Sequence, residues 1–204
     1  MIVTWPCAAN ISPRLCVTDK NVTEPDRAGL KAVLEAGDVR LEPLGEHHLE
    51  PLRAACAEDQ DIWQVYPVNL LGDGFDEAMA RFDQLDSWVR FAVIDARGGK
   101  VVGCTNYINP DPWGVVEIGG TYIAPSVRGG IFNRTKKKLM IEHAFASGYH
   151  KIEWRVDTRN KRSMAAVLKL GAKQEGVLRQ NRVTWTGYRR DTAVFGMLQG
   201  EWAG

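Results

Sequence analysis

EIGGTYIAPSVRGGIFNRTKKKL, residues 117–139, is the stretch that decides the fold. A β-rich run over Ile118 to Ile123 stops at Ala124-Pro125, and Arg128-Gly129-Gly130 then opens a helix with basic residues near its start. Unpaired N–H groups at a helix N-terminus and the helix dipole favour an anion, and Arg128 can add a forked donor. The stretch therefore predicts an anion site, with a phosphate group as the ligand.

Composition limits the class of protein. The chain has 204 residues, enough for one domain with a core, and a net charge of +1 gives no global attraction to nucleic acid. No apolar run approaches the roughly 20 residues that span a bilayer. The start of the chain has no basic n-region and no sustained apolar core, so it is a poor secretory signal, and the 4 cysteines lack CxxC spacing. These features predict a cytoplasmic protein with reduced thiols and no membrane segment.

The first 37 residues differ from the rest of the chain. They form a polar, proline-interrupted stretch in which only Asp26 to Ala36 has the pattern of a short helix. We therefore expect residues 1–37 to be an N-terminal extension and residues 38–204 to form a single domain.

Hydrophobic periodicity then predicts a regular order of elements. Strands are predicted at residues 39–43, 91–94, 101–107, 115–123, 152–156, 177–184 and 192–198. Helices are predicted at residues 46–57 and 75–82, from the glycine loop to Gly148, and at residues 162–170. The order β-α-α-β-β-β-α-β-α-β-β indicates a mixed α/β sandwich.

Three motifs stand along this order of elements. They are the loop that begins at Arg128, the run Asp157-x-x-Asn160-x-x-Ser163 followed by Leu170-Gly171-Ala172, and Glu175-Gly176-Val177-Leu178-Arg179 followed by Arg190-Asp191-Thr192 and Glu201-Trp202. Together they resemble the GCN5-related N-acetyltransferase (GNAT) superfamily, and most closely its Rim-type branch of ribosomal-protein N-terminal acetyltransferases. The resemblance covers residues 38–202.

This resemblance implies a central, mostly antiparallel twisted sheet that is splayed in the middle, with helices on both faces. It implies that acetyl-CoA is the acetyl donor, with its pantetheine arm along Tyr122, Ile123 and Ala124. The residues expected to bind the rest of the cofactor are Arg128, Gly129, Gly130, Phe132, Asn133 and Arg134. Ile131 occupies the position where the family has its central glycine.

The chemistry of acetyl transfer requires a base and a proton donor. Glu117 is the candidate general base because the family often places a carboxylate on this strand, although an ion pair with Arg155 is an equal alternative. Ser163 either protonates the departing thiolate or caps its helix. Asn160 either binds the pantetheine amide or caps the same turn.

Aromatic residues in loops and at strand ends are predicted to ring the acceptor cleft, namely Trp63, Tyr66, Trp113 and Trp185. The lysine run 136–138 is predicted to form a solvated helix face that can also meet the 3′-phosphate of CoA. His47-His48 is expected on the surface without metal-site spacing, and Cys104 as a buried, inert thiol.

The sequence thus predicts a cytoplasmic, acetyl-CoA-dependent N-acetyltransferase that transfers acetyl directly to a primary amine. The acceptor is a protein N-terminus or a small-molecule amine, and neither a metal nor nucleic acid is expected. A non-catalytic acyl-CoA-binding or regulatory module is the alternative, and the last two strands could support a homodimer.

Overall fold

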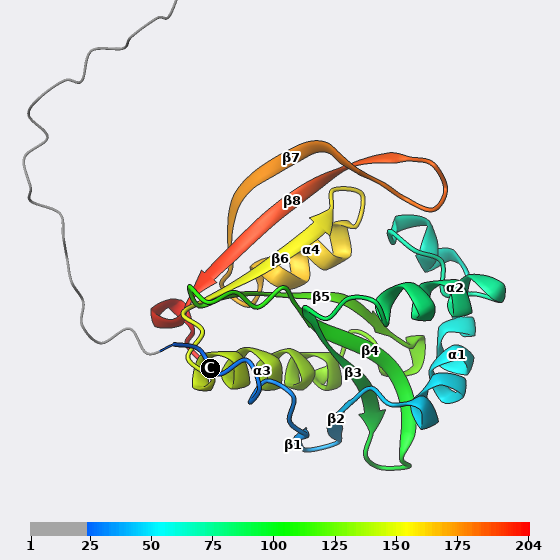
Figure 1. Cartoon of the computed structure of the whole chain (residues 1–204), viewed down its shortest axis with the longest axis horizontal. Helices are drawn as coiled ribbons and strands as arrows, with labels where there is room; N and C mark the ends of the chain where they lie inside the picture. The colour runs from blue at the N-terminus through cyan, green and yellow to red at the C-terminus, as the bar shows by residue number, and fades with distance from the viewer. Residues whose placement is uncertain (1–23) are drawn as a thin grey trace, which may run out of the picture.

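Eight strands form one mixed sheet in the computed structural model, which describes residues 24–204 (Figure 1). The strands are β1 (Leu34–Ala36), β2 (Val39–Pro43), β3 (Trp88–Asp95), β4 (Lys100–Ile108), β5 (Val115–Ile123), β6 (Lys151–Asp157), β7 (Lys173–Val183) and β8 (Arg189–Leu198). Their order across the sheet is β1-β2-β3-β4-β5-β6-β8-β7. Every neighbouring pair is antiparallel except β5 and β6, which are parallel. This confirms the predicted mixed fold.

Helices cover both faces of the sheet, as predicted (Figure 1). The α-helices are α1 (Leu49–Ala57), α2 (Asp73–Phe82), α3 (Ile131–Ala146) and α4 (Lys161–Leu168). The 3-10 helices are η1 (Glu46–His48), η2 (Asp61–Val65), η3 (Pro125–Val127) and η4 (Gln199–Glu201). Helix α3 packs on β1, β2, β5 and β6, and α4 packs on β6, whereas α1 packs on β4. Two apolar cores result, one on each face of the sheet.

The sheet opens between β5 and β6. Only Val115–Glu117 pairs with β6, opposite Lys151–Glu153. The pairing of β5 with β4 shifts register nearby, and Gly120 there has a φ of +56°, which favours glycine. The Asn106 side-chain amide donates to the Gly119 and Gly120 carbonyls at 3.1 and 3.3 Å. This bulge turns β5 away from its parallel neighbour.

The described part of the N-terminal segment differs from expectation. Residues 26–36 form turns and the short strand β1 instead of a helix, because β1 finds a partner in β2. Leu30 and Leu34 are buried in the main core, so this part packs with the domain. The expected extension over residues 1–23 lies outside the described residues. None of the helices in the described part is both long and apolar enough to cross a membrane.

Candidate active site

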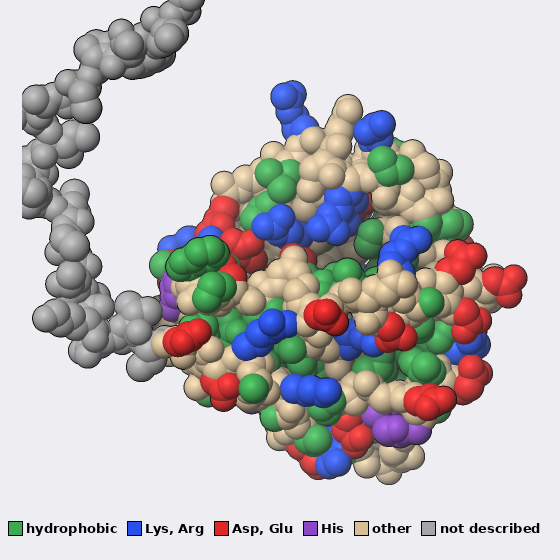
Figure 2. Space-filling view, viewed as in Figure 1, with side chains coloured by type: hydrophobic (Ala, Val, Ile, Leu, Met, Phe, Trp, Pro, Cys, Tyr) green, Lys and Arg blue, Asp and Glu red, His purple; other side chains and the backbone are tan. Residues whose placement is uncertain are grey.

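A cleft of about 1210 Å³ lies where β5 and β6 diverge. Its walls come from β5, the starts of α3 and α4, the residues that follow η2, the second half of β6, and single residues of β7 and β8. The space-filling view shows a hollow at the centre of the molecule, below β7 and β8 (Figure 2). The strand, the glycine loop and the helix start that the sequence singled out therefore share one cleft.

The free edge of β5 is formed by Thr121 and Ile123. The Ala124 N–H donates to the Val102 carbonyl of β4 at 2.7 Å, so the backbone groups of Ala124, and by strand alternation those of Tyr122, face β4. Tyr122 is a core residue whose hydroxyl donates to the Ala55 carbonyl. Of the three residues expected along the pantetheine arm, only Ile123 offers its backbone to the cleft.

Two side chains already contact this edge. The Tyr66 hydroxyl donates to the Thr121 carbonyl at 2.6 Å. The Arg128 guanidinium donates to the Ile123 carbonyl from Nε and Nη2, at 2.9 and 2.7 Å, and its Nη1 pairs with Asp59 at 2.5 Å. Arg128 therefore folds back onto its own loop and strand, and it positions the loop rather than reaching outward as the expected phosphate donor.

The glycine loop leads directly into α3. Gly129 has a φ of +83°, Gly130 precedes the helix as its N-cap residue, and both line the cleft. Ile131 is the first helical residue, and 75% of its surface is exposed. Its β-branched side chain points into solvent, so the departure from glycine does not fill the loop. The N–H groups of the first turn of α3 remain suited to a diphosphate.

Helix α3 presents its side chains differently from the prediction. Phe132 is buried in the core and does not contact the cleft. Asn133 and Arg134 line the cleft, and the buried Asn133 Oδ1 has no hydrogen-bond partner among the described residues. Lys136 is only 1% exposed, and burial lowers its pKa to about 7. The lysine run is therefore not a uniform solvated face.

Glu117 lies at the point where β5 and β6 part, and it lines the cleft. Its carboxylate is 3.5 Å from Arg155 Nε, so the ion pair weighed as the alternative is present. Burial nevertheless outweighs that arginine and raises the pKa of Glu117 to about 7. A carboxylate with this pKa can accept a proton near neutral pH, so ion pairing and general-base chemistry are compatible.

Asn160 and Ser163 both line the cleft at the start of α4. The Asn160 side chain accepts the Ser163 N–H at 3.0 Å, and Asn160 is thereby the N-cap of the helix. Ser163 is the third residue of α4, so it does not cap the helix. Its position in the cleft leaves its hydroxyl available as the proton donor that the sequence predicts, and that role stays a prediction.

Only one of the four predicted acceptor aromatics lines the cleft, namely Tyr66. Trp63 is fully buried and stacks on Tyr122 with 4.8 Å between ring centroids, so a core role replaces its predicted acceptor role. Trp113 is 76% exposed, outside the cleft. The Trp185 indole N–H donates to the Trp63 carbonyl at 2.8 Å and ties the β7–β8 turn to η2.

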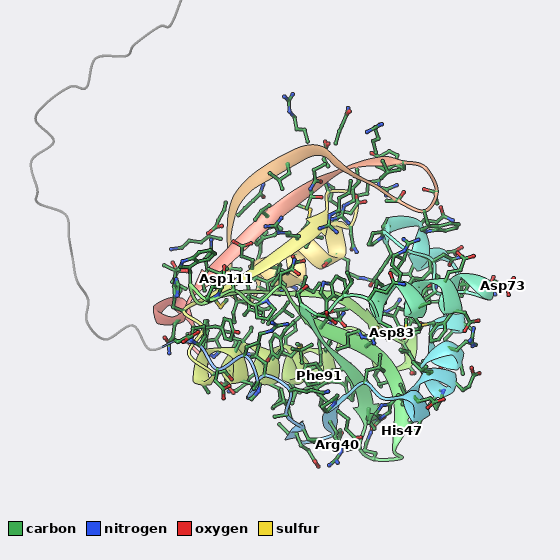
Figure 3. The ribbon with its side chains drawn as sticks, viewed as in Figure 1. Arg40, His47, Asp73, Asp83, Phe91 and Asp111 are labelled. Atoms are coloured by element: carbon green, nitrogen blue, oxygen red, sulfur yellow. The ribbon has the colours of Figure 1, made fainter. Side chains whose placement is uncertain are left out.

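The histidine pair lies away from the cleft, where Figure 3 labels His47 near the start of α1 and Arg40 on β2. The sequence predicted a surface position for both histidines, but His48 is buried. Its Nδ1 accepts the Gly45 N–H at 3.0 Å, which leaves the Nε2 proton directed at Glu42, 3.4 Å away. His48, Glu42 and His47 could surround a metal ion, but these hydrogen bonds already account for His48.

The thiol of Cys104 is buried, and burial raises its pKa to about 11. Such a thiol carries almost no thiolate at neutral pH. This supports the expectation of an inert residue.

Sequence reasoning did not place Arg182 and Arg190 in the cleft, and it expected Lys136 on a solvated helix face. Lys136 had a usable signal, because it lies four residues after Phe132 and four before Met140, and this spacing places all three on one helix face. Arg182 and Arg190 had no such signal in the sequence. Their position depends on the pairing of β7 with β8, which periodicity does not specify.

The comparisons with known proteins agree with this geometry. The sequence matches the acetyltransferase (GNAT) domain family over residues 38–173, and the chain belongs to this family. It is therefore an acyltransferase enzyme, and the predicted GNAT resemblance is confirmed. No curated protein sequence matches the chain.

Solved structures show the same fold. A GCN5-related N-acetyltransferase from Brucella melitensis is 30% identical, with 90% of this chain and 85% of that chain covered and a TM-score of 0.79. A probable GNAT-family acetyltransferase from Chromobacterium violaceum is 29% identical, with 98% and 100% covered and a TM-score of 0.81. Mycobacterium smegmatis RimJ, in complex with CoA-disulfide, shares the fold at 19% identity, with 89% and 93% covered and a TM-score of 0.73.

Proposed function

We propose that this enzyme transfers acetyl from acetyl-CoA directly to the primary amine of an acceptor. The observation that carries the proposal is the position of Glu117, in the cleft at the point where β5 leaves β6, with its pKa raised to about 7. The RimJ structure in complex with CoA-disulfide supports a CoA thioester as the donor.

The donor half of the cleft offers backbone groups. The Thr121 and Ile123 N–H groups on the free edge of β5 suit the pantetheine carbonyls, since the carbonyls of both residues already accept from Tyr66 and Arg128. The first turn of α3 suits the diphosphate. Asn133 Oδ1, a buried acceptor without a partner among residues 24–204, suits an amide N–H or a hydroxyl of the pantetheine arm. These contacts would hold the thioester beside Glu117.

In the reaction, the amine nitrogen attacks the thioester carbonyl carbon. A C–N bond forms, the C–S bond breaks, and Glu117 takes the proton that the nitrogen loses, directly or through one water. The Ser163 hydroxyl would relay a proton to the departing thiolate, giving up its own proton and taking one from the water of the cleft. The buried Cys104 is a poor candidate for an acyl-enzyme, because burial raises the pKa of its thiol to about 11 and leaves almost no thiolate at neutral pH.

The test begins with calorimetry of acetyl-CoA binding, followed by CoA release from an amine panel measured with a thiol reagent. Intersecting initial-rate lines and full activity of Cys104→Ala support direct transfer. Parallel lines would contradict it. Acetyl-CoA binding without CoA release from any amine would favour the non-catalytic module, and absence of binding would reject both functions.

A further inference from the structure

Arg190, on β8, is a buried cation that forms no ion pair with any residue in the described part of the chain. Only 5% of its surface is exposed, and it lines the cleft. Its Nε donates to Thr192 Oγ1 at 3.0 Å, and this hydroxyl donates in turn to Asn181 Oδ1 at 2.6 Å. Within residues 24–204 the two Nη groups have neither a hydrogen-bond nor an ion-pair partner. Because a guanidinium keeps its proton in proteins, these Nη groups reach only the water of the open cleft until an anion arrives.

The carboxylates near Arg190 are already engaged. Asp157 takes the Arg159 guanidinium at 2.8 and 3.0 Å. Glu117 pairs with Arg155, and its raised pKa leaves it only partly ionised at neutral pH. Neither forms an ion pair with Arg190, and burial lowers the pKa of this guanidinium despite their field.

A second arginine lies directly opposite. Arg182 on β7 pairs in register with Arg190, and it also lines the cleft. Like charges at directly opposed positions of an antiparallel pair destabilise a sheet. Arg182 makes no ion pair with any residue of the described range either, so only the more distant charges of Asp157 and Glu117 act against the repulsion at Arg190.

Both arginines lie on the same face of the sheet as Glu117. Strand register shows this, because Glu117 pairs with Glu153, Asp157 pairs with Thr192, and side chains alternate along each strand. Arg190 is two residues from Thr192, and Arg182 is its partner on β7. Lys and Arg side chains gather at the hollow below β7 and β8 in Figure 2.

We propose that Arg190 and Arg182 bind an anionic group, a carboxylate or a phosphate, carried by the amine acceptor. The inference rests on the proposed acetyl transfer and adds the substrate class. The Arg190 fork suits two oxygens of one anionic group, while the amine of the same molecule lies at Glu117. An unpaired guanidinium pair at this position disfavours polyamines, whose every charge is positive.

The experiment compares acceptors that differ only in the anionic group. Glycine, β-alanine and 4-aminobutyrate are assayed against their carboxamides, O-phosphoethanolamine against ethanolamine, and spermidine is the cationic comparison. We expect kcat/KM to be about 10- to 100-fold higher for the anionic member of at least one pair, as for hydrogen bonds to charged groups. The carboxylate and phosphate pairs distinguish the two sources, and the carboxylate series gives the distance from the amine.

Three variants assign the effect to these residues. Arg190→Gln and Arg182→Gln should each lower the ratio of kcat/KM for the anionic acceptor to that for the neutral one at least fivefold. At about 1.36 kcal/mol per tenfold change, this is about 1 kcal/mol. Calorimetric binding of acetyl-CoA should stay unchanged. Arg189→Gln is the matched control, since Arg189 is the next residue of β8, is exposed and does not line the cleft. If Arg190→Gln fails to fold, Arg182→Gln still decides, because Arg182 is exposed.

Failure of this inference is separable from failure of the proposed function. Acetylation of neutral amines or spermidine as efficiently as the anionic partners would overturn the anion site and leave acetyl transfer intact. If no amine is acetylated, inorganic phosphate and acetate serve as probes of the CoA-saturated protein in thermal unfolding. Stabilisation by either anion that is lost in Arg182→Gln would support the site, and equal stabilisation of both proteins would reject it.

Discussion

Replacing Glu117 by glutamine should make the enzyme more stable and nearly inactive. Burial raises the pKa of Glu117 from 4.5 to about 7 in the folded protein. The folded state therefore holds the proton more tightly than the unfolded state does, and stability falls as pH rises from about 4.5 to about 7. The difference of about 2.5 in pKa, at about 1.36 kcal/mol per pKa unit, gives a cost of about 3 kcal/mol above pH 7.

Glutamine has no proton to lose and escapes this cost. The free energy of unfolding of Glu117→Gln, relative to that of the wild type, should increase by about 3 kcal/mol between pH 4.5 and pH 8. Urea unfolding at the two pH values measures it. The charged groups that act on Glu117 are Arg155 and Glu153 of β6, Arg182 of β7 and Arg190 of β8, and all of them remain in the variant.

Activity should move in the opposite direction. Loss of a general base lowers turnover by about 10²- to 10⁴-fold, and acetyl-CoA affinity by calorimetry should be unchanged. In the wild type, kcat/KM should rise with pH through about 7 and then level off as Glu117 ionises. Glu142→Gln, an exposed change on α3, is the control for charge removal.

Unchanged turnover in Glu117→Gln would remove Glu117 from the mechanism. A stability difference that does not vary with pH would refute the raised pKa. The activity and stability measurements are independent, because the unfolding measurement needs neither acetyl-CoA nor an acceptor.

Three further substitutions test the packing around the cleft. Trp63→Ala should lower the free energy of unfolding in urea by about 3 to 5 kcal/mol because the ring is fully buried. Trp113→Ala, at an exposed site, should change it by no more than about 0.5 kcal/mol. Equal effects would contradict the core role of Trp63. Lys136→Met removes a buried amine whose pKa falls from 10.5 to about 7 on folding. The stability of the variant relative to the wild type should therefore grow as pH falls from about 10 to 7. A stability difference that is constant with pH would count against the lowered pKa. Asn160→Ala should cost about 1 kcal/mol through the lost cap of α4, and an unchanged denaturation midpoint would rule that role out.

The sequence was sufficient to predict the strands and helices with strong hydrophobic periodicity. It failed at β1, because three residues are too few to show a strand pattern and the pairing with β2 stabilises them. It also misplaced Trp63, which lies in the short helix η2. Apolar side chains in such a segment look like loop residues until α1 and α2 are seen to enclose them.

The site was predictable in location and only partly in detail. The glycine loop and Glu117 follow from the sequence, since local turn chemistry and strand position carry that information. Arg128 shows the limit of such reasoning. An arginine in a phosphate-binding loop suggests an outward donor, but its true partners, Asp59 and the Ile123 carbonyl, depend on how η2 approaches β5.

Charge divides the two halves of the cleft in a way that links binding to catalysis. On the donor side, Asp59 neutralises Arg128, and burial lowers the pKa of Lys136, so backbone N–H groups dominate. On the side proposed for the acceptor, Arg190 forms no ion pair with the described residues and, with Arg155, opposes the protonation of Glu117. An anion bound to Arg190 would weaken that opposition and raise the pKa of Glu117. An anionic acceptor would therefore make the base stronger at the moment when its amine arrives.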